Sequence, residues 1–216
     1  MQFSVSHQDT KAVNFDIYSL LKRHGFGTIA DKLKPDLQLM GKLLNEFFDR
    51  FGEAPIDDLM FIIGDDLSSV ITDFGRDMDA FQREFAKKSP QVAAIVKVAS
   101  GLFTQIGQAF KTTFSVLLVG QKRKGKPLYD KRLGQVEVKL STNIGKLLTP
   151  EQSPKWLSVF VEFFGMLGRA SNQAIQKSLD RVKVLGILPP QYIPIQLFGQ
   201  TLDLLLNQII GVFKDI

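Results

Sequence analysis

The 216-residue chain contains no cysteine and only two histidines, His7 and His24. Without cysteine there can be no disulfide, no thiolate metal ligand and no cysteine nucleophile. Two histidines cannot form a three-histidine zinc site, and neither stands three residues after a glutamate, as a di-iron bundle requires. Tryptophan and tyrosine are also scarce, with one and three residues beside 18 phenylalanines. We therefore expect no bound metal and no cofactor.

Two short matches to catalytic motifs each lack a required part. Residues 120–126 follow the phosphate-loop pattern G-x-x-x-x-G-K, but Pro127 stands where a serine or threonine must hold magnesium. The tripeptide at 73–75 spells Asp-Phe-Gly, yet no other kinase element accompanies it. Since every catalytic arrangement tested in this way is incomplete, the sequence favours a protein that is not an enzyme.

No segment has the pattern of a secretory signal or of a membrane-spanning helix. The amino terminus lacks a basic start and an apolar run. The longest uncharged stretch, residues 184–202, contains three prolines and three glutamines, which a lipid-facing helix would not carry together. We expect an intracellular, cytoplasmic protein, and peripheral attachment to a membrane stays open.

Apolar residues recur at intervals of three and four, which predicts an all-α fold. We expect a single domain spanning 1–216, built as one bundle of six or seven antiparallel helices, several of them long. Ser89-Pro90 should form the tightest reversal, and segment 92–119, which carries only two charges, should lie at the centre of the bundle. The expected helices span 10–24 with Asp9 as N-cap, 28–33, 35–51, 55–88, 90–119, 153–185 and 195–213.

Two regions leave alternatives open. Residues 114–140 could form a small β-hairpin around the basic loop, because Val136, Val138 and Leu140 alternate, or they could continue as helix, since Leu133, Val136, Leu140, Ile144 and Leu147 form a stripe. The apolar C-terminal helix follows a proline-rich connector, residues 187–194. We expect this helix to fill a groove of the bundle, and a detachable anchor is the alternative.

Positive charge is concentrated in one basic loop, residues 120–135. This loop carries six cations and one anion, a net charge of +5 that equals the net charge of the whole chain. Such a loop could neutralise phosphates of a lipid surface or of a nucleic acid. The candidate residues for an anionic partner are Lys122, Arg123, Lys124, Lys126, Lys131 and Arg132.

One segment resembles the death-motif helix of the Bcl family of apoptosis regulators. The resemblance rests on residues 56–67, where three apolar positions and a small residue precede an aspartate and a fourth apolar position follows it. Segments 10–24 and 156–165 are similar to the first and central helices of that family. The chain departs from the pattern at Met60, where leucine is usual, and has no Asn-Trp-Gly-Arg motif to pair with the aspartate. The resemblance implies an apolar groove or partner site with these residues: Ile56, Met60, Ile63, Asp65 and Leu67.

Together these features predict a binding or assembly protein without enzymatic activity. Its basic loop and apolar helices would contact an anionic or apolar partner, with a protein partner or self-association expected and no small-molecule substrate. The alternatives are a membrane- or lipid-engaging helical protein, including a Bcl-like regulator, and a protein that coats RNA or DNA.

Overall fold

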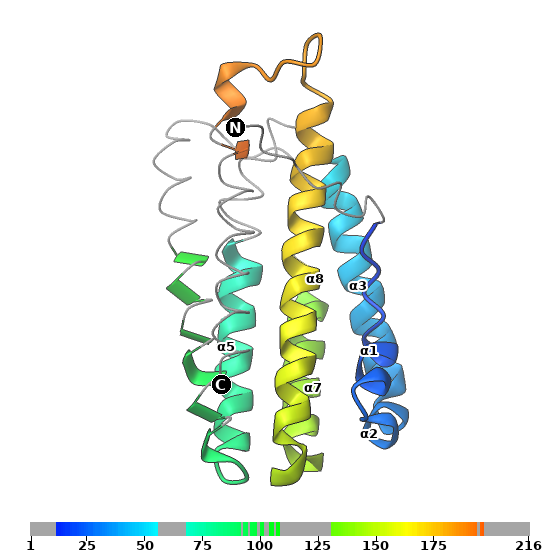
Figure 1. The fold of residues 1–216 in the computed structure, drawn as a ribbon, viewed down its shortest axis with the longest axis vertical. Helices are drawn as coiled ribbons and strands as arrows, with labels where there is room; N and C mark the ends of the chain where they lie inside the picture. Colours follow the sequence, from blue (N-terminus) through cyan, green and yellow to red (C-terminus); the bar gives the residue numbers. More distant parts are fainter. Residues whose placement is uncertain are drawn as a thin grey trace, which may run out of the picture.

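The computed structural model describes residues 12–55, 68–91, 131–193 and 195–196, and also 93–94, 96–98, 100–101, 104–105 and 107–108. These residues are mostly helical, and none of them belongs to a strand, so the all-α prediction is confirmed. Figure 1 shows an elongated bundle with α8 running along its length. The α-helices are α1 (Ile17–Arg23), α2 (Gly27–Lys32), α3 (Lys34–Glu53), α5 (Ser68–Phe85), α7 (Lys131–Leu147) and α8 (Ser153–Asp180).

Helix α1 begins later than the sequence predicted. Residues 12–16 are not helical, and the N-cap is Asp16 rather than Asp9. The Asp16 carboxylate accepts hydrogen bonds from the Ser19 backbone N–H at 3.0 Å and from the Ser19 hydroxyl at 2.7 Å. These bonds, the backbone one first, hold the pKa of Asp16 below its usual value. A satisfied cap at Asp16 thus outweighs the helical spacing of the preceding apolar residues.

The predicted end of α1 at Lys22 to Gly25 is confirmed and has a specific geometry. Gly25 adopts a φ of +86°, which costs a residue without a side chain little. The N–H groups of Gly25 and Phe26 donate to the carbonyls of Lys22 and Leu21, at 3.1 and 3.0 Å. This is the Schellman arrangement, and it turns the buried Phe26 back onto Leu21.

Helix α3 begins with Pro35 in its first turn, as predicted, and buries one apolar face. The face carries Phe47 and Phe51, whose rings stack with centroids 6.2 Å apart. Phe48 lies edge-on to Phe47 at 5.0 Å and is partly buried. This aromatic row forms the part of the core between α3 and α8.

The reversal predicted at Ser89-Pro90 is present, but the following helical segment is not central. The Ala93 N–H donates to the Ser89 carbonyl at 3.0 Å, and residues 90–108 are helical wherever the structure describes them. Val98 is 58% exposed, and Ala94 and Gly101 are exposed as well. The prediction of a central position is therefore wrong for the described part. Small and neutral residues tolerate water, so scarcity of charge did not require burial on all sides.

Segment 90–108 packs closely against α5 through two copies of one pattern. A Cβ atom at Gly75 would lie 2.9 Å from the Ser100 carbonyl oxygen, and one at Gly107 would lie 2.8 Å from the Ser68 carbonyl oxygen. The Ser100 hydroxyl donates to the Gly75 carbonyl at 2.7 Å. Each helix contributes Ser-x-x-x-Thr-x-x-Gly, so the contact repeats itself with the helices exchanged. The residues are Ser68, Thr72 and Gly75 on α5, and Ser100, Thr104 and Gly107 on the partner helix.

Helix α7 lies in the region for which the sequence allowed either a β-hairpin or a helix. Residues 131–147 are helical, so the strand proposed for 136–140 is wrong and the helical stripe is confirmed. Val136, Leu140 and Ile144 are buried at the expected spacing of four. The other half of that hairpin, 114–119, lies outside the described residues. Because the buried positions repeat at four rather than two, packing favoured the helix over the local β-propensity.

Successive long helices alternate in direction, but two pairs of neighbours that are distant in sequence run parallel. The carboxyl ends of α3 and α8 meet, where Arg181 donates to the Ala54 carbonyl at 2.6 Å. The carboxyl ends of α5 and α7 also meet, since Lys88 donates to the Gly145 carbonyl. Among the described helices, none combines the length and the apolar character needed to cross a membrane.

Candidate functional site: an exposed apolar turn beyond α8

A two-residue turn projects from the bundle just beyond the end of α8 (Figure 1). Val184 and Ile187 exchange backbone hydrogen bonds of 2.9 and 3.0 Å, which closes residues 184–187 into a small loop. The two central residues have positive φ, +52° for Leu185 and +78° for Gly186. This combination is that of a type I′ turn, in which asparagine or glycine usually takes the position of Leu185.

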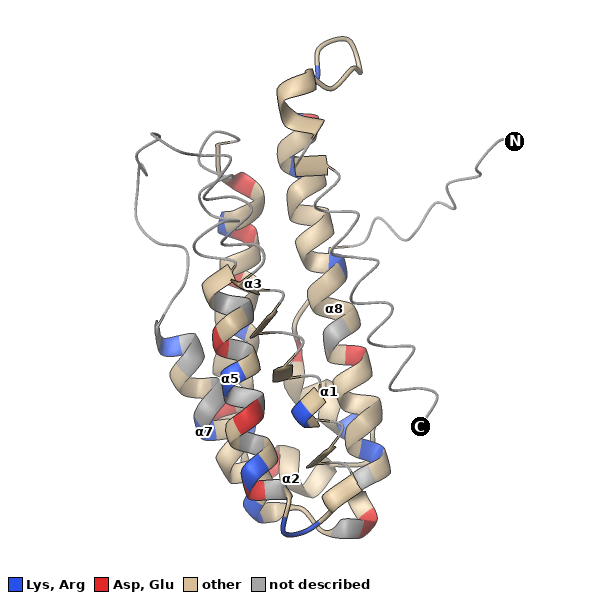
Figure 2. Cartoon of the chain, turned by 90° about the vertical axis from the view of Figure 1, so that its left-hand side faces the viewer, with Lys and Arg blue, Asp and Glu red and all other residues tan. Residues whose placement is uncertain are grey.

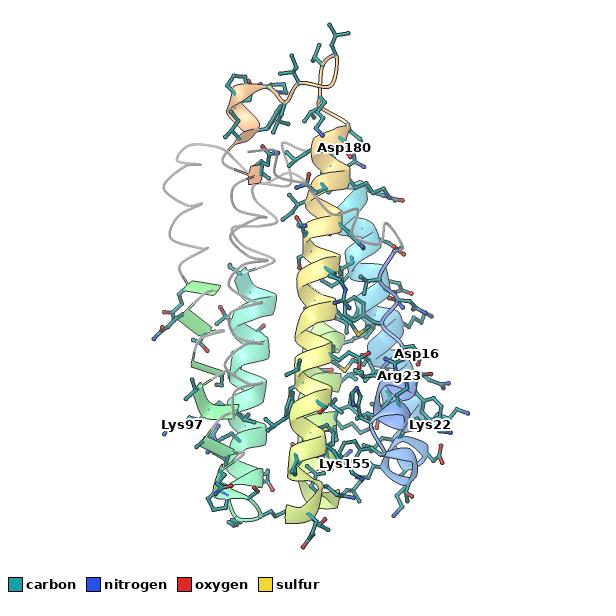
Figure 3. The ribbon with its side chains drawn as sticks, in the orientation of Figure 1. Asp16, Lys22, Arg23, Lys97, Lys155 and Asp180 are labelled. Carbon is teal, nitrogen blue, oxygen red and sulfur yellow. The ribbon has the colours of Figure 1, made fainter. Side chains whose placement is uncertain are left out.

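Residues 184–187, called the apolar turn below, present aliphatic side chains to water. Leu185 is 97% exposed, and Val184 and Ile187 are 64% and 73% exposed. Side chains of this segment extend outward above Asp180 in Figure 3. A leucine in the left-handed region costs roughly 1 to 2 kcal/mol. The turn therefore keeps an apolar side chain at its tip at some cost to the stability of the fold.

The base of the apolar turn is fixed to the bundle. Arg181 donates to the Ala54 carbonyl and, at 3.1 Å, to the Ser178 hydroxyl. Lys183 donates to Asp180 at 2.6 Å. On the other side, Pro190–Tyr192 forms a 3-10 turn, and Ile195 is fully buried. The tip thus extends from an anchored base, with cationic groups close behind it.

The sequence did not predict this feature. The 153–185 helix was expected to place Leu185 on its buried stripe, but α8 ends at Asp180 and Leu185 points into water. The start was predicted correctly, because Pro150–Gln152 forms a 3-10 turn and α8 begins at Ser153. One signal was present. The apolar residues 184–188 lie between the end of a helix and two prolines, and a turn is a common connection there.

A second feature, a cluster of polar side chains, joins the α1–α2 region to α8. Glu162 on α8 forms an ion pair with Arg23 and a hydrogen bond of 2.5 Å with His24. Partial burial, which alone would raise the pKa of Glu162, is outweighed by the hydrogen bonds from His24 and Arg23, so the pKa lies below its usual value. The α1–α2 region also contacts α8 through Phe26, whose ring packs on Trp156 with centroids 4.6 Å apart.

Replacing Glu162 by glutamine should weaken the attachment of α1 and α2 in a way that depends on pH. A carboxylate with a lowered pKa stabilises the fold above its unfolded pKa, near 4.5, and this contribution is lost as the pH falls through the lower folded pKa. We expect Glu162→Gln to reduce the unfolding free energy by about 1 kcal/mol at pH 7 and by less at pH 3, because solvent screens a partly exposed group. Denaturant titrations followed by Trp156 fluorescence measure this difference.

The matched control for this substitution is Glu46→Gln. Glu46 pairs with Lys42 across 3.8 Å on the exposed face of α3. An exposed pair of this kind contributes a few tenths of a kcal/mol at most. Equal losses in the two variants, or a loss for Glu162→Gln that grows as the pH is lowered, would contradict the role assigned to Glu162.

Most residues predicted for the anionic site lie outside the described residues, namely Lys122, Arg123, Lys124 and Lys126. Lys131 and Arg132 begin α7, and Arg132 is exposed there. On the described helices basic and acidic residues are interspersed (Figure 2).

The predicted apolar site also lies outside the described residues. This holds for the whole resemblance segment, 56–67, and so for Ile56, Met60, Ile63, Asp65 and Leu67. The expected C-terminal helix is described only at Ile195 and Gln196. Its position in a groove therefore stays a prediction.

Comparisons with known proteins give no relative for this chain. Searches against protein-family models, curated proteins and solved structures found no match.

Proposed function

We propose that the protein is a non-enzymatic binding protein that docks on an acidic lipid surface through the apolar turn. The observation that carries the proposal is Leu185, which is 97% exposed in a strained conformation at the tip of an anchored loop. A convex tip with three aliphatic side chains is far smaller than the roughly 800 Å² that each partner contributes to a standard protein interface. A fluid lipid surface, in contrast, closes around a small protrusion.

The apolar contribution alone would give weak binding. Full burial of one aliphatic side chain yields about 1.5 to 3 kcal/mol, so the three exposed side chains of the turn offer about 5 kcal/mol before the cost of association. Even before that cost, about 5 kcal/mol corresponds to a dissociation constant of only about 0.2 mM, and the cost weakens binding further. A single myristoyl chain binds membranes with similarly marginal strength, and stable attachment then requires a second signal.

Cationic residues behind the turn supply such a second signal. Three cations, Lys177, Arg181 and Lys183, lie at the base of the turn with two anions, Glu53 and Asp180, which pair with Lys177 and Lys183, so the net charge of this group is +1. Each cation near an acidic membrane surface contributes about 1 kcal/mol, and salt weakens this contribution. The predicted basic loop would add to the same attraction. The proposal therefore requires acidic lipids and predicts sensitivity to salt.

Leu185→Asn should stabilise the protein and at the same time impair binding to lipid. Asparagine adopts positive φ readily, so we expect a gain of about 1 kcal/mol in the unfolding free energy, or about 2 to 4 °C in Tm. Loss of the apolar tip should weaken binding to phosphatidylcholine vesicles with about 30% phosphatidylserine by roughly tenfold or more. Thermal melts and vesicle flotation measure the two effects, which have opposite signs.

The control is Leu39→Asn, which removes a 42% exposed leucine from the second turn of α3. This variant should float with vesicles as the wild type does. Wild-type binding should also fall on vesicles of phosphatidylcholine alone and in high salt. Undiminished flotation of Leu185→Asn, or failure of the wild type to bind the acidic vesicles, would rule out the proposal.

A further inference from the structure

Residues 12–16, called the strap below, form a non-helical segment held by side chains from two helices, with a tight turn at Phe15 where the Asp16 N–H donates to the Asn14 carbonyl at 3.0 Å. The Val13 N–H donates to the Gln173 side-chain carbonyl of α8 at 3.3 Å. The Phe15 N–H donates to the Asn45 side-chain carbonyl of α3 at 2.8 Å. The strap runs along α3 in Figure 1. Two amide side chains thus bind alternate backbone N–H groups, as a neighbouring strand would.

The strap lies in a groove between α3 and α8. This groove also holds the Phe15 side chain and leaves space for the Phe15 carbonyl group. Phe15 is 2% exposed, and its ring stacks on Phe48 at 5.4 Å and meets Phe163 edge-on at 6.3 Å. A Cβ atom at Gly41 would lie 2.2 Å from the Phe15 carbonyl oxygen, so only glycine leaves room for the backbone there. The groove therefore has a backbone clamp, an aromatic pocket and a slot for a carbonyl.

The strap belongs to neither a helix nor a sheet, and its contacts with the bundle are like those of a bound peptide. Its residues alternate in exposure, with Val13 and Phe15 turned inward and Ala12, Asn14 and Asp16 outward. Asn45 contacts both faces, because its Nδ2 donates to the Asn14 side-chain carbonyl at 2.9 Å. A separate open cavity of about 470 Å³ adjoins this outer face. It leaves room for larger side chains on the outward side of the strap. Specificity therefore resides in the two inward positions.

We propose that the groove between α3 and α8 is a recognition site for short non-helical peptides, which the chain fills with its own strap. The partner that fits is a protein segment with an aliphatic residue two positions before a phenylalanine. The observation that identifies this occupant is the strap itself, whose Val13 and Phe15 define what the groove accepts. In the wild type the strap competes with such a segment, so access to the groove depends on release of residues 12–16.

The test uses the full-length chain and a synthetic peptide of residues 10–16 with blocked ends. Phe15→Ala empties the aromatic pocket in the chain, and Phe15→Leu fills it in part and preserves more of the fold. We expect the peptide to bind Phe15→Ala at least tenfold more tightly than the wild type, with Phe15→Leu between them. Isothermal titration calorimetry gives the affinities, after circular dichroism has shown which variants are folded.

A second peptide in which alanine replaces the phenylalanine is the control for the pocket. It should bind every folded form of the chain at least tenfold more weakly than the first peptide. Adding Asn45→Ala to Phe15→Leu should weaken binding of the first peptide relative to Phe15→Leu alone, because the backbone clamp is lost. Equal affinities for the two peptides, or no binding by any folded variant, would overturn the proposal.

Discussion

Gly101→Ala and Gly107→Ala should change the stability of the protein in opposite directions, although both glycines lie on the helical segment 90–108. At Gly101 a Cβ atom would meet nothing within 4 Å, so alanine should raise the unfolding free energy by about 0.5 to 1 kcal/mol through its helix propensity. At Gly107 a Cβ atom would lie 2.8 Å from the Ser68 carbonyl oxygen and 3.0 Å from the Thr72 backbone nitrogen. Both atoms belong to the backbone of α5, so neither can make room for the methyl group unless the helix itself shifts.

For Gly107→Ala we expect a net loss of about 1 to 2 kcal/mol, because overpacking outweighs the gain in helix propensity. The two variants should then differ in Tm by about 4 to 10 °C in thermal melts followed by circular dichroism. Gly75→Ala should behave like Gly107→Ala, because its Cβ would meet the Ser100 carbonyl oxygen at 2.9 Å. A stabilised Gly107→Ala variant would show that α5 and segment 90–108 are not packed this closely.

Gly41→Ala should be the more damaging substitution, since it displaces the strap. The added methyl group would lie 2.2 Å from the Phe15 carbonyl oxygen, and relief requires this backbone to leave α3. Phe15 would leave the core with it. By analogy with deletion of a buried phenylalanine, we expect a loss of about 3 kcal/mol or more and a fall in Tm of about 6 to 12 °C.

Gly27→Ala is the matched control for Gly41→Ala. A Cβ atom at Gly27, at the start of α2, meets nothing within 4 Å. This variant should melt at or slightly above the wild-type temperature. Proteolysis should also cleave Gly41→Ala near residue 12 more rapidly, because the strap no longer lies on α3. If Gly41→Ala has the same melting temperature as Gly27→Ala, the strap does not contribute to the core as described.

The sequence predicted the helices well where a periodic apolar face coincided with a start or stop signal. Pro35 at the beginning of α3, Ser153-Pro154 at the beginning of α8 and Gly25 after α1 all marked true boundaries. The start of α1 was misplaced because Val13 and Ile17 fit a helical spacing of four. In the structure Val13 belongs to the non-helical strap, whose backbone N–H groups at Val13 and Phe15 donate to Gln173 and Asn45, and no local pattern reveals such distant partners.

The candidate site was harder to predict than the fold. The sequence pointed to the basic loop and to the apolar segment 56–67, and of these candidate residues only Lys131 and Arg132 lie among the described residues. Leu185 was expected in the core because it continues the spacing of α8. Its exposure depends on where α8 stops, and no glycine or proline marks that point at Asp180. The end of α8 coincides instead with the tertiary contact of Arg181.

Arg181 also has a mechanical consequence. Its guanidinium joins the last turn of α8 to the carboxyl end of α3, only three residues before the apolar turn begins. The two helices run parallel and end side by side at this point. A pull on the apolar turn is therefore transmitted along the axes of both helices at once, so that the load tends to slide them past their neighbours rather than peel one away.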